Sequence, residues 1–182
     1  MKMKRMISDP DVRLLASIAG LLRADYVDFE KEGLWRESPF AWISTAPARQ
    51  VCKIGEQLIA GWFAAKGLDV TRSGDSEADR VIAGRRMEIR CSLLLKNGVY
   101  TFQQIRDQDY DYAICLGVSP FEAQCWVISK DVLRKHVFRH TSQDRGRLGT
   151  DAFWLSFQAN DPPDWLKSCG GSLSEAFVVL KS

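Results

Sequence analysis

The sequence predicts a mixed α/β fold in which helices flank a central β-sheet. Residues 111–118 are almost continuously apolar, which is typical of a strand buried on both faces. Apolar and polar residues alternate over 87–92, which indicates a second strand. Over 48–66 apolar residues recur at helical spacing, and Gly67 follows as a helix-ending residue. With 182 residues, of which 46% are hydrophobic, the chain can bury a substantial core.

The chain divides into three consecutive parts that we expect to form one overall domain. Residues 1–47 hold a predicted amphipathic helix, from Pro10 to about Asp28, and an aromatic-rich connection. Residues 48–135 form the α/β core. Residues 136–182 form a C-terminal appendage, with strand-like and helical segments, that packs on this core.

The composition predicts a protein of a reducing compartment. Five cysteines are scattered along the chain without a C-x-x-C pair, so we expect buried thiols and neither disulfides nor a zinc site. The basic first residues, 1–6, lack an apolar core, and no apolar run approaches the roughly 20 residues that span a bilayer. We therefore expect a cytoplasmic protein without membrane contact. The formal net charge of +2 predicts no strong overall attraction for polyanions.

Residues 79–92 predict a β-hairpin that gathers charged side chains. Gly84 suits a tight turn between two short strands. In the second strand Glu88 and Arg90 share a face, and a turn at this position sets Asp79 opposite Glu88, within one residue of register. Two carboxylates so placed repel each other unless a cation lies between them, and Mg²⁺ is the usual ion in an all-oxygen site. The alternative is a hairpin whose charged face is simply solvated.

In their order and spacing these residues resemble the PD-(D/E)XK superfamily of restriction-endonuclease-like nucleases. The superfamily pattern has a Glu on a helix, then an Asp, a spacer, Glu-x-Lys and often a Gln-bearing segment. The matching residues here are Gly55-Glu56, Asp79, Glu88-Ile89-Arg90 and Gln103-Gln104. The resemblance covers roughly residues 53–133. Ala78 stands where the superfamily's Pro is usual, and Arg90 stands at the position of its Lys.

The resemblance implies a restriction-endonuclease-like sheet flanked by helices, and a restriction-type endonuclease that hydrolyses DNA phosphodiester bonds with Mg²⁺, or Mn²⁺ in its place. It implies a homodimer, because such enzymes usually cut both strands of a duplex. The implied metal ligands are Asp79, Glu88 and the carbonyl of Ile89. The implied catalytic residues are Asp79, Glu88, Arg90, Glu56 and Gln104. Of these, Glu56 would support the metal and Gln104 would assist positioning, and Asp75 is a reserve candidate if Asp79 is not a ligand.

Arg90 leaves a second function open. An arginine stays protonated, so it cannot act as a base, but its planar guanidinium can hold a phosphate and offset developing negative charge. The alternative is a nuclease-fold module with weakened or absent catalysis that binds nucleic acid or assembles with a partner. RNA also remains open as the substrate.

Basic and amide side chains near the predicted site are candidates for contact with a nucleic-acid backbone. These candidates are Arg85, Arg86, Gln103, Arg106, Arg145 and Arg147. For each basic residue, a solvated surface position is the alternative.

Overall fold

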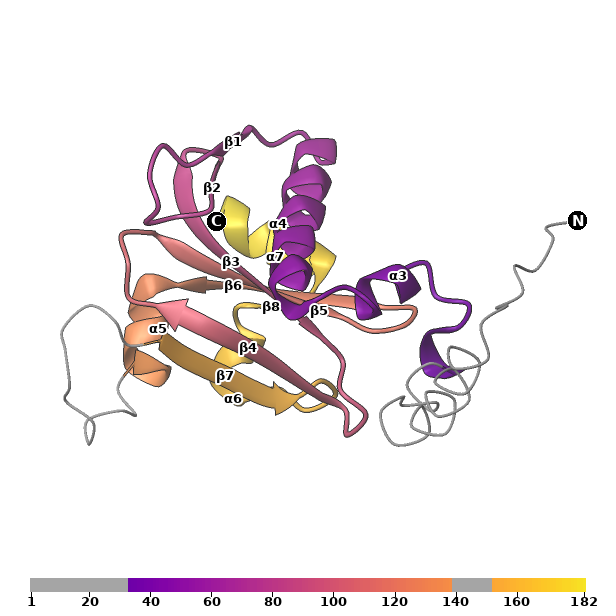
Figure 1. The fold of residues 1–182 in the computed structure, drawn as a ribbon. Helices are drawn as coiled ribbons and strands as arrows, with labels where there is room; N and C mark the ends of the chain where they lie inside the picture. Colours follow the sequence, from indigo (N-terminus) through magenta and orange to yellow (C-terminus); the bar gives the residue numbers. More distant parts are fainter. Residues whose placement is uncertain (1–32, 139–151) are drawn as a thin grey trace, which may run out of the picture. The chain divides into compact units, whose positions relative to one another are not determined.

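A six-stranded mixed β-sheet runs through the centre of the fold (Figure 1). In chain order its strands are β1 (Val70–Arg72), β2 (Arg80–Ile82), β3 (Arg85–Leu93), β5 (Tyr112–Val118), β6 (Ala123–Ser129) and β8 (Gly170–Ser172). Across the sheet they lie in the order β1-β2-β3-β5-β6-β8; β3 and β5 run parallel, and the other neighbours run antiparallel. The structure is a computed structural model that describes residues 33–138 and 152–182. The predicted helix at residues 10–28 lies outside these ranges.

A second, two-stranded sheet packs on the first. It consists of β4 (Val99–Arg106) and β7 (Ala152–Gln158), which pair in antiparallel fashion. Aromatic side chains join the two sheets. The indole of Trp126 on β6 packs edge-on against the ring of Phe157, with centroids 5.0 Å apart, and against the ring of Tyr100 at 6.1 Å. Burial of these large rings is the main favourable contribution to this half of the core.

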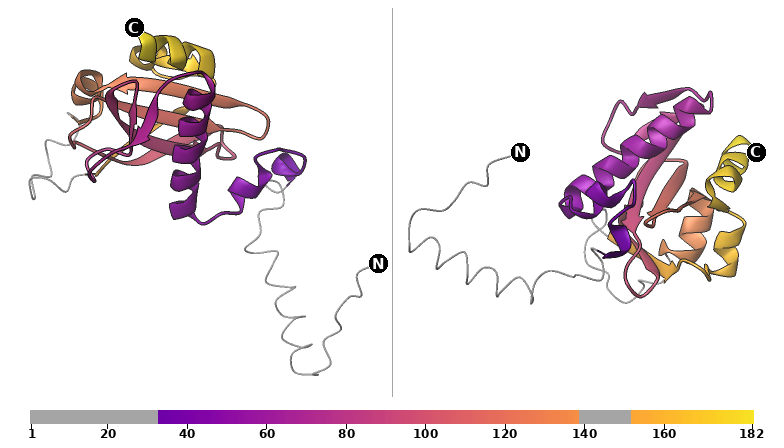
Figure 2. Two further views of the ribbon diagram at one scale, coloured as in Figure 1. Left: turned by 90° about the horizontal axis from the view of Figure 1, so that it is seen from above. Right: turned by 90° about the vertical axis from the view of Figure 1, so that its right-hand side faces the viewer.

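Helices lie on both sides of the central sheet (Figure 2). The described helices are α3 (Ala41–Ser44), α4 (Ala48–Ala65), α5 (Lys130–His136), α6 (Asp164–Lys167) and α7 (Leu173–Lys181). Helices α4 and α7 cover one face, and the β4–β7 pair covers the other together with α5 and α6, whose Leu133 and Leu166 join the same core. This arrangement confirms the predicted mixed sheet flanked by helices. Within the described ranges, every helix is too short or too polar to cross a membrane.

Helix α4 approaches β3 closely because Gly55 has no side chain. A Cβ atom at this position would lie 2.2 Å from Cβ of Cys91, well inside van der Waals contact. Ile59 and Phe63, one and two turns further along, are fully buried against the sheet. The helix then ends before Gly67, which adopts a φ of 84°, as the sequence predicted. The chain from Glu37 onward forms a compact unit of its own.

Candidate functional site

The predicted hairpin is present and brings Asp79 beside Glu88. Its two turn residues, 83 and 84, have φ values of 50° and 78°, which suit the tight two-residue turns of β-hairpins. Arg80 pairs with Met87 across β2 and β3, and the backbone N–H of Asp79 donates to the Met87 carbonyl at 2.8 Å. Asp79 therefore lies just beyond the last pair of the ladder and beside Glu88, within the one-residue margin of register that the sequence predicted.

The site lies where β2 stops pairing with β3. The β2–β3 ladder reaches Met87, and beyond it no strand in the described part of the chain pairs with this edge of β3. At this point the Asp79 side chain replaces the neighbouring strand as a hydrogen-bond partner of β3, because its Oδ2 accepts a hydrogen bond of 2.7 Å from the backbone N–H of Ile89. The backbone N–H and C=O of Ile89 both point to this edge, so the Ile89 carbonyl faces the same space as the Asp79 carboxylate.

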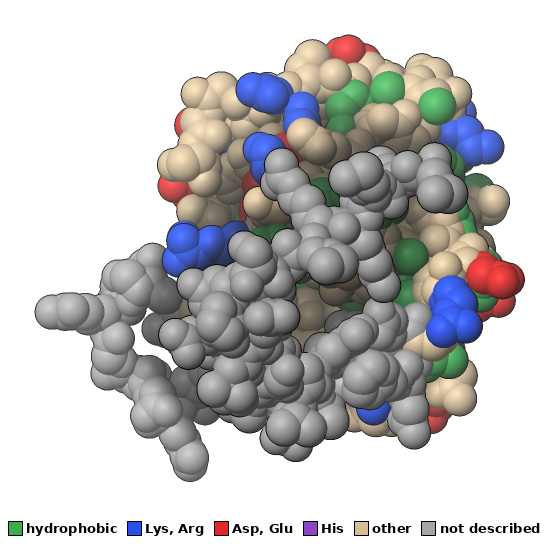
Figure 3. Space-filling model, turned by 45° about the vertical axis from the view of Figure 1, so that its right-hand side comes forward, with side chains coloured by type: hydrophobic (Ala, Val, Ile, Leu, Met, Phe, Trp, Pro, Cys, Tyr) green, Lys and Arg blue, Asp and Glu red, His purple; other side chains and the backbone are tan. Residues whose placement is uncertain are grey.

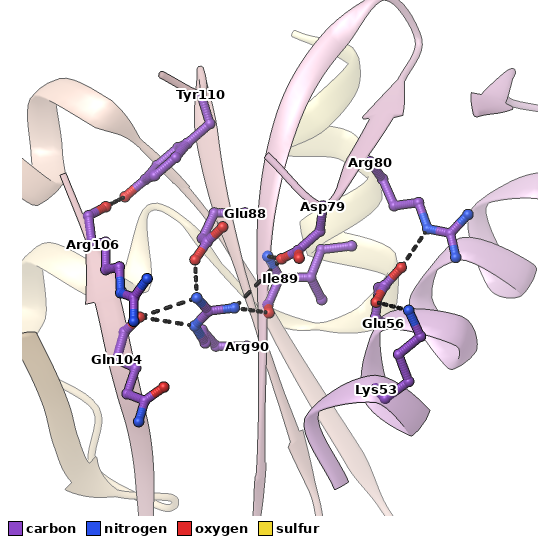
Figure 4. Close-up of polar contacts among 10 residues, drawn as sticks. All are labelled: Lys53, Glu56, Asp79, Arg80, Glu88, Ile89, Arg90, Gln104, Arg106 and Tyr110. Carbon is purple, nitrogen blue, oxygen red and sulfur yellow. Dashed lines mark hydrogen bonds and ion pairs between the residues drawn. The ribbon is translucent and has the colours of Figure 1, made fainter. Parts of the chain in front are cut away.

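The guanidinium of Arg90 contacts all three groups predicted to bind a metal (Figure 4). Its Nη1 donates to the Ile89 carbonyl at 2.8 Å and lies 3.4 Å from Oδ2 of Asp79. Its Nη2 donates to Oε1 of Glu88. The two carboxylates and the carbonyl thus converge on one point, as predicted. In this structure the cation at that point is the chain's own arginine.

A β-bulge on β4 holds the other edge of the same guanidinium. The pairing of β4 with β7 shifts between Phe102 and Ile105, and Gln104 within this interval has a φ of 60°. The bulge directs the Gln104 carbonyl at Arg90, whose Nε and Nη2 donate to it at 3.1 and 3.0 Å. The Gln104 side-chain amide, which the sequence predicted to assist positioning, extends away from the guanidinium (Figure 4). Its backbone carbonyl, not its amide, reaches the site.

The two carboxylates differ sharply in their surroundings. Glu88 is 2% exposed, whereas the side chain of Asp79 retains 31% of its accessible surface. Burial, together with the nearby Asp79 carboxylate, raises the pKa of Glu88 to about 7, although Arg90 acts to lower it. Tyr110, also buried, lies beside Glu88, and its hydroxyl donates to the Arg106 carbonyl at 2.7 Å (Figure 4). Solvent therefore reaches this site from the Asp79 side.

The donor atoms at the site suit Mg²⁺. Two carboxylates and one carbonyl oxygen, completed by water and substrate oxygens, match the all-oxygen coordination that this ion prefers. No cluster of three or more His, Cys, Asp or Glu side chains that could hold a metal occurs in residues 33–138 and 152–182. Asp79, Glu88 and the Ile89 carbonyl are the oxygen donors that could hold an ion here, and Arg90 would then have to leave at least part of this set.

Glu56 lies apart from the two carboxylates. On α4, its Oε1 is 2.8 Å from Nε of Arg80, and its Oε2 is 3.4 Å from Nζ of Lys53 (Figure 4). Arg80 follows Asp79 directly in the chain, and successive side chains of a strand point to opposite faces. Glu56 is thus on the α4 face of the sheet, whereas Asp79 and Glu88 face β4. The structure does not bring the predicted helix glutamate into the site.

Arg86 and Asp75 form a clamp between two loops. The Nη1 and Nη2 atoms of Arg86 contact the Asp75 carboxylate at 3.0 and 2.8 Å, and Nε donates to the Asp109 carbonyl at 2.7 Å. This paired hydrogen bonding holds the pKa of Asp75 at about 2. The clamp ties the loop that leads to Asp79 against the connection between β4 and β5. Arg86 is a predicted phosphate contact, and Asp75 is the reserve metal ligand. In the structure their side chains pair with each other instead.

Three of the remaining nucleic-acid candidates lie in the described part of the chain. Arg85 donates to the carbonyl of Leu180, near the C-terminal end of α7, at 2.8 Å, and Gln103 and Arg106 are exposed on β4. Arg145 and Arg147 lie outside the described residues. On the face drawn in Figure 3, the described Lys and Arg side chains occur in small separate groups, in keeping with the net charge of +2.

A groove of about 470 Å³ follows β3 beyond the site. It is lined by α4, the end of β3 and β4, through Ala48, Val51, Cys52, Cys91, Ser92, Leu93, Leu95, Thr101, Gln103 and Trp154. Trp154 on β7 is 63% exposed. A signal for this position is present in the sequence: Phe153, Leu155 and Phe157 alternate with Trp154 and Ser156, so strand periodicity puts this indole on the polar face.

Comparison with known proteins yields similarity at the level of structure alone. No protein-family model matches the chain, and no curated protein matches it. Among solved structures, the chain is similar to a bacterial homing endonuclease with a TM-score of 0.49 and 15% sequence identity, over 75% of this chain and 94% of that chain. At this level of similarity, function has to be inferred from the site itself.

Proposed function

We propose that this protein is a metal-dependent nuclease that hydrolyses DNA phosphodiester bonds at the site of Asp79 and Glu88. The observation that supports the proposal is the convergence of these two carboxylates with the Ile89 carbonyl at the unpaired edge of β3. Two carboxylates repel each other, so a fold that brings them together favours a cation between them or a proton on one of them. The proposed activity is that of a restriction-type endonuclease.

Each group has a role in the proposed reaction. A Mg²⁺ or Mn²⁺ ion at this site would activate a water molecule and polarise the scissile phosphate. Asp79 and Glu88 would hold the ion, with the Ile89 carbonyl. Arg90 would stabilise negative charge on the phosphate, because a guanidinium matches the spacing of two phosphate oxygens. The groove beside β3, with Trp154 and Gln103 in its lining, would take the neighbouring part of the substrate.

Assembly follows from the symmetry of the proposed substrate. A DNA duplex has two strands related by approximate two-fold axes, and one copy of this chain holds one such site within the described residues. A homodimer would present two sites related by the same symmetry. We therefore propose that the active form is a homodimer.

A second function has its own support in the structure. Arg90 already contacts both carboxylates, and Glu56 is paired with Arg80 and Lys53. With a cation of the chain already between the two carboxylates, the site does not need a metal ion in order to fold. The second candidate is therefore a module that keeps the fold, binds nucleic acid and does not cut it.

Incubation of purified protein with supercoiled plasmid DNA, with Mg²⁺, Mn²⁺ or a chelator, distinguishes the two functions. The informative variants are Asp79→Asn and Glu88→Gln, which keep the size of each side chain and remove its charge. Asp131→Asn is the matched control, because it changes an exposed carboxylate on α5, away from the site.

For a nuclease we expect cutting that needs the metal, that both site variants lose, and that Asp131→Asn retains. A shift of the DNA in a gel without any cutting, by wild type and variants alike, would support the binding module. Protein that neither binds nor cuts DNA would reject both.

A further inference from the structure

All the donors of the Arg90 guanidinium are engaged within the protein. An arginine side chain has five N–H groups. Nε donates to the Gln104 carbonyl, Nη1 contacts the Ile89 carbonyl and Asp79, and Nη2 contacts Glu88 and again the Gln104 carbonyl. Each of the five N–H groups is thus matched by an oxygen of the chain. In this arrangement Arg90 has no donor left for a substrate phosphate.

A metal ion and this guanidinium compete for the same oxygens. Any ion bound by Asp79, Glu88 and the Ile89 carbonyl would lie where Nη1 and Nη2 now lie. Two positive charges at that separation also repel each other strongly in a partly buried site. The side chains of Arg90 and Glu88 are 17% and 3% exposed, so solvent screens this repulsion only weakly. Occupation by one cation therefore excludes the other.

We propose that Arg90 is a built-in cation that keeps the metal site closed until a nucleic-acid phosphate draws its guanidinium away. A phosphate offers the same bidentate oxygen pair as a carboxylate, and the groove beside β3 is lined by Cys91 and Gln103, the chain neighbours of Arg90 and Gln104. Movement of Arg90 onto the phosphate frees Asp79 and the Ile89 carbonyl for the ion. Metal and nucleic acid then bind cooperatively, and each binds weakly in the absence of the other.

This inference rests on the proposed function, because it takes the same three groups to be a metal site. It adds a regulatory step: the protein holds little metal when no nucleic acid is present. Because it concerns binding, it can be tested without cleavage.

The first test measures Mn²⁺ binding to the full chain by isothermal titration calorimetry in the absence of DNA. We expect Arg90→Ala to bind Mn²⁺ at least about tenfold more tightly than wild type, since each charge-assisted hydrogen bond lost from the free state favours the ion. The double variant Asp79→Asn, Arg90→Ala should lose this gain. Arg106→Ala is the matched control, because it removes a guanidinium from β4 and leaves the donors of Arg90 in place. An unchanged affinity in Arg90→Ala, or an equal gain in Arg106→Ala, would overturn the proposal.

A second measurement uses the wild-type protein, in case the alanine variant does not fold. The Nε–H of Arg90 gives a resonance in ¹⁵N-labelled protein that Arg90→Lys identifies by its loss. We expect a short DNA duplex to shift this resonance, Mg²⁺ alone to leave it nearly unchanged, and both together to complete the shift. A resonance that stays in place with saturating duplex and Mg²⁺ would show that Arg90 does not move, and would overturn the proposal.

The results separate this inference from the proposed function. If Arg90→Ala binds metal more tightly but no form of the protein cuts DNA, the competition is real and the nuclease proposal fails. If wild type cuts DNA and Arg90→Ala binds metal no better than wild type, the nuclease proposal stands and the inference fails.

Discussion

The buried carboxyl of Glu88 predicts a loss of stability as the pH rises toward neutrality. Burial raises its pKa from the ordinary value of 4.5 to about 7 in the folded protein. Between these two values the folded state holds a proton that the unfolded state has released. Unfolding therefore becomes easier as the pH rises from about 4.5 to 7, which is the reverse of the usual behaviour of a salt-bridged acid.

The size of the effect follows from the two pKa values. Each pH unit between them corresponds to about 1.4 kcal/mol. Glu88 is 2% exposed, so solvent screening lowers this free-energy change only slightly. The free energy of unfolding should therefore fall by about 3 kcal/mol across this range on account of Glu88 alone. Above pH 7 its contribution stays constant, because the carboxyl is then ionised in both states.

Urea denaturation at a series of pH values from 4.5 to 8 measures this effect. The variant Glu88→Gln stays neutral throughout, so the difference between wild type and variant cancels the other titrating groups. We expect wild type to lose stability relative to Glu88→Gln as the pH rises. A difference that is constant, or that changes in favour of wild type, would show that Glu88 is ionised in its pair with Arg90 at every pH, and would refute the reasoning.

Three further sets of substitutions test the framework of the site. Gly55→Ala should lower the free energy of unfolding by about 1–3 kcal/mol in urea denaturation, because its Cβ would lie 2.2 Å from that of Cys91, and Cys91→Gly should restore part of the loss. Gln104→Val should cost about 1–2 kcal/mol by the same measurement, since a β-branched residue resists a φ of 60°, whereas Gln104→Gly should be nearly neutral. Asp75→Asn and Arg86→Met should each increase proteolytic nicking of residues 73–79, because each removes the clamp on that loop. If both variants resist protease as well as wild type does, the clamp does not hold the loop.

Local sequence was enough to predict the hairpin and the faces of its side chains. A two-residue turn at 83–84 fixes the register, and strand periodicity then sets Asp79 beside Glu88 with Arg90 on the same side. The buried strand at 111–118 was recognised for a similar reason, because burial on both faces leaves a continuous apolar run. These predictions depend on residues a few positions apart, where geometry leaves little choice.

The partners of charged side chains were not predictable in the same way. Glu56 pairs with Arg80, 24 residues later in the chain, because α4 packs across the strand that carries Arg80. The carbonyl of Gln104 reaches Arg90 because of a bulge, and the local sequence shows only two glutamines and no glycine there. Long side chains have many rotamers, so their partners are decided by tertiary packing. The fold that brings Asp79 and Glu88 near each other therefore leaves Glu56 with other partners on the α4 face of the sheet.

The arginine at position 90 has consequences that a lysine there would not have. An ammonium group is a compact point charge with three donors, whereas the guanidinium is a planar fork with five. Only the fork can contact Asp79, Glu88 and the Ile89 carbonyl along one side while the Gln104 carbonyl binds the other. A lysine would neutralise one carboxylate well and leave oxygens free for an ion. The exchange of lysine for arginine thus changes which cation holds the site in the free protein, and metal binding by Arg90→Lys should fall between that of wild type and Arg90→Ala.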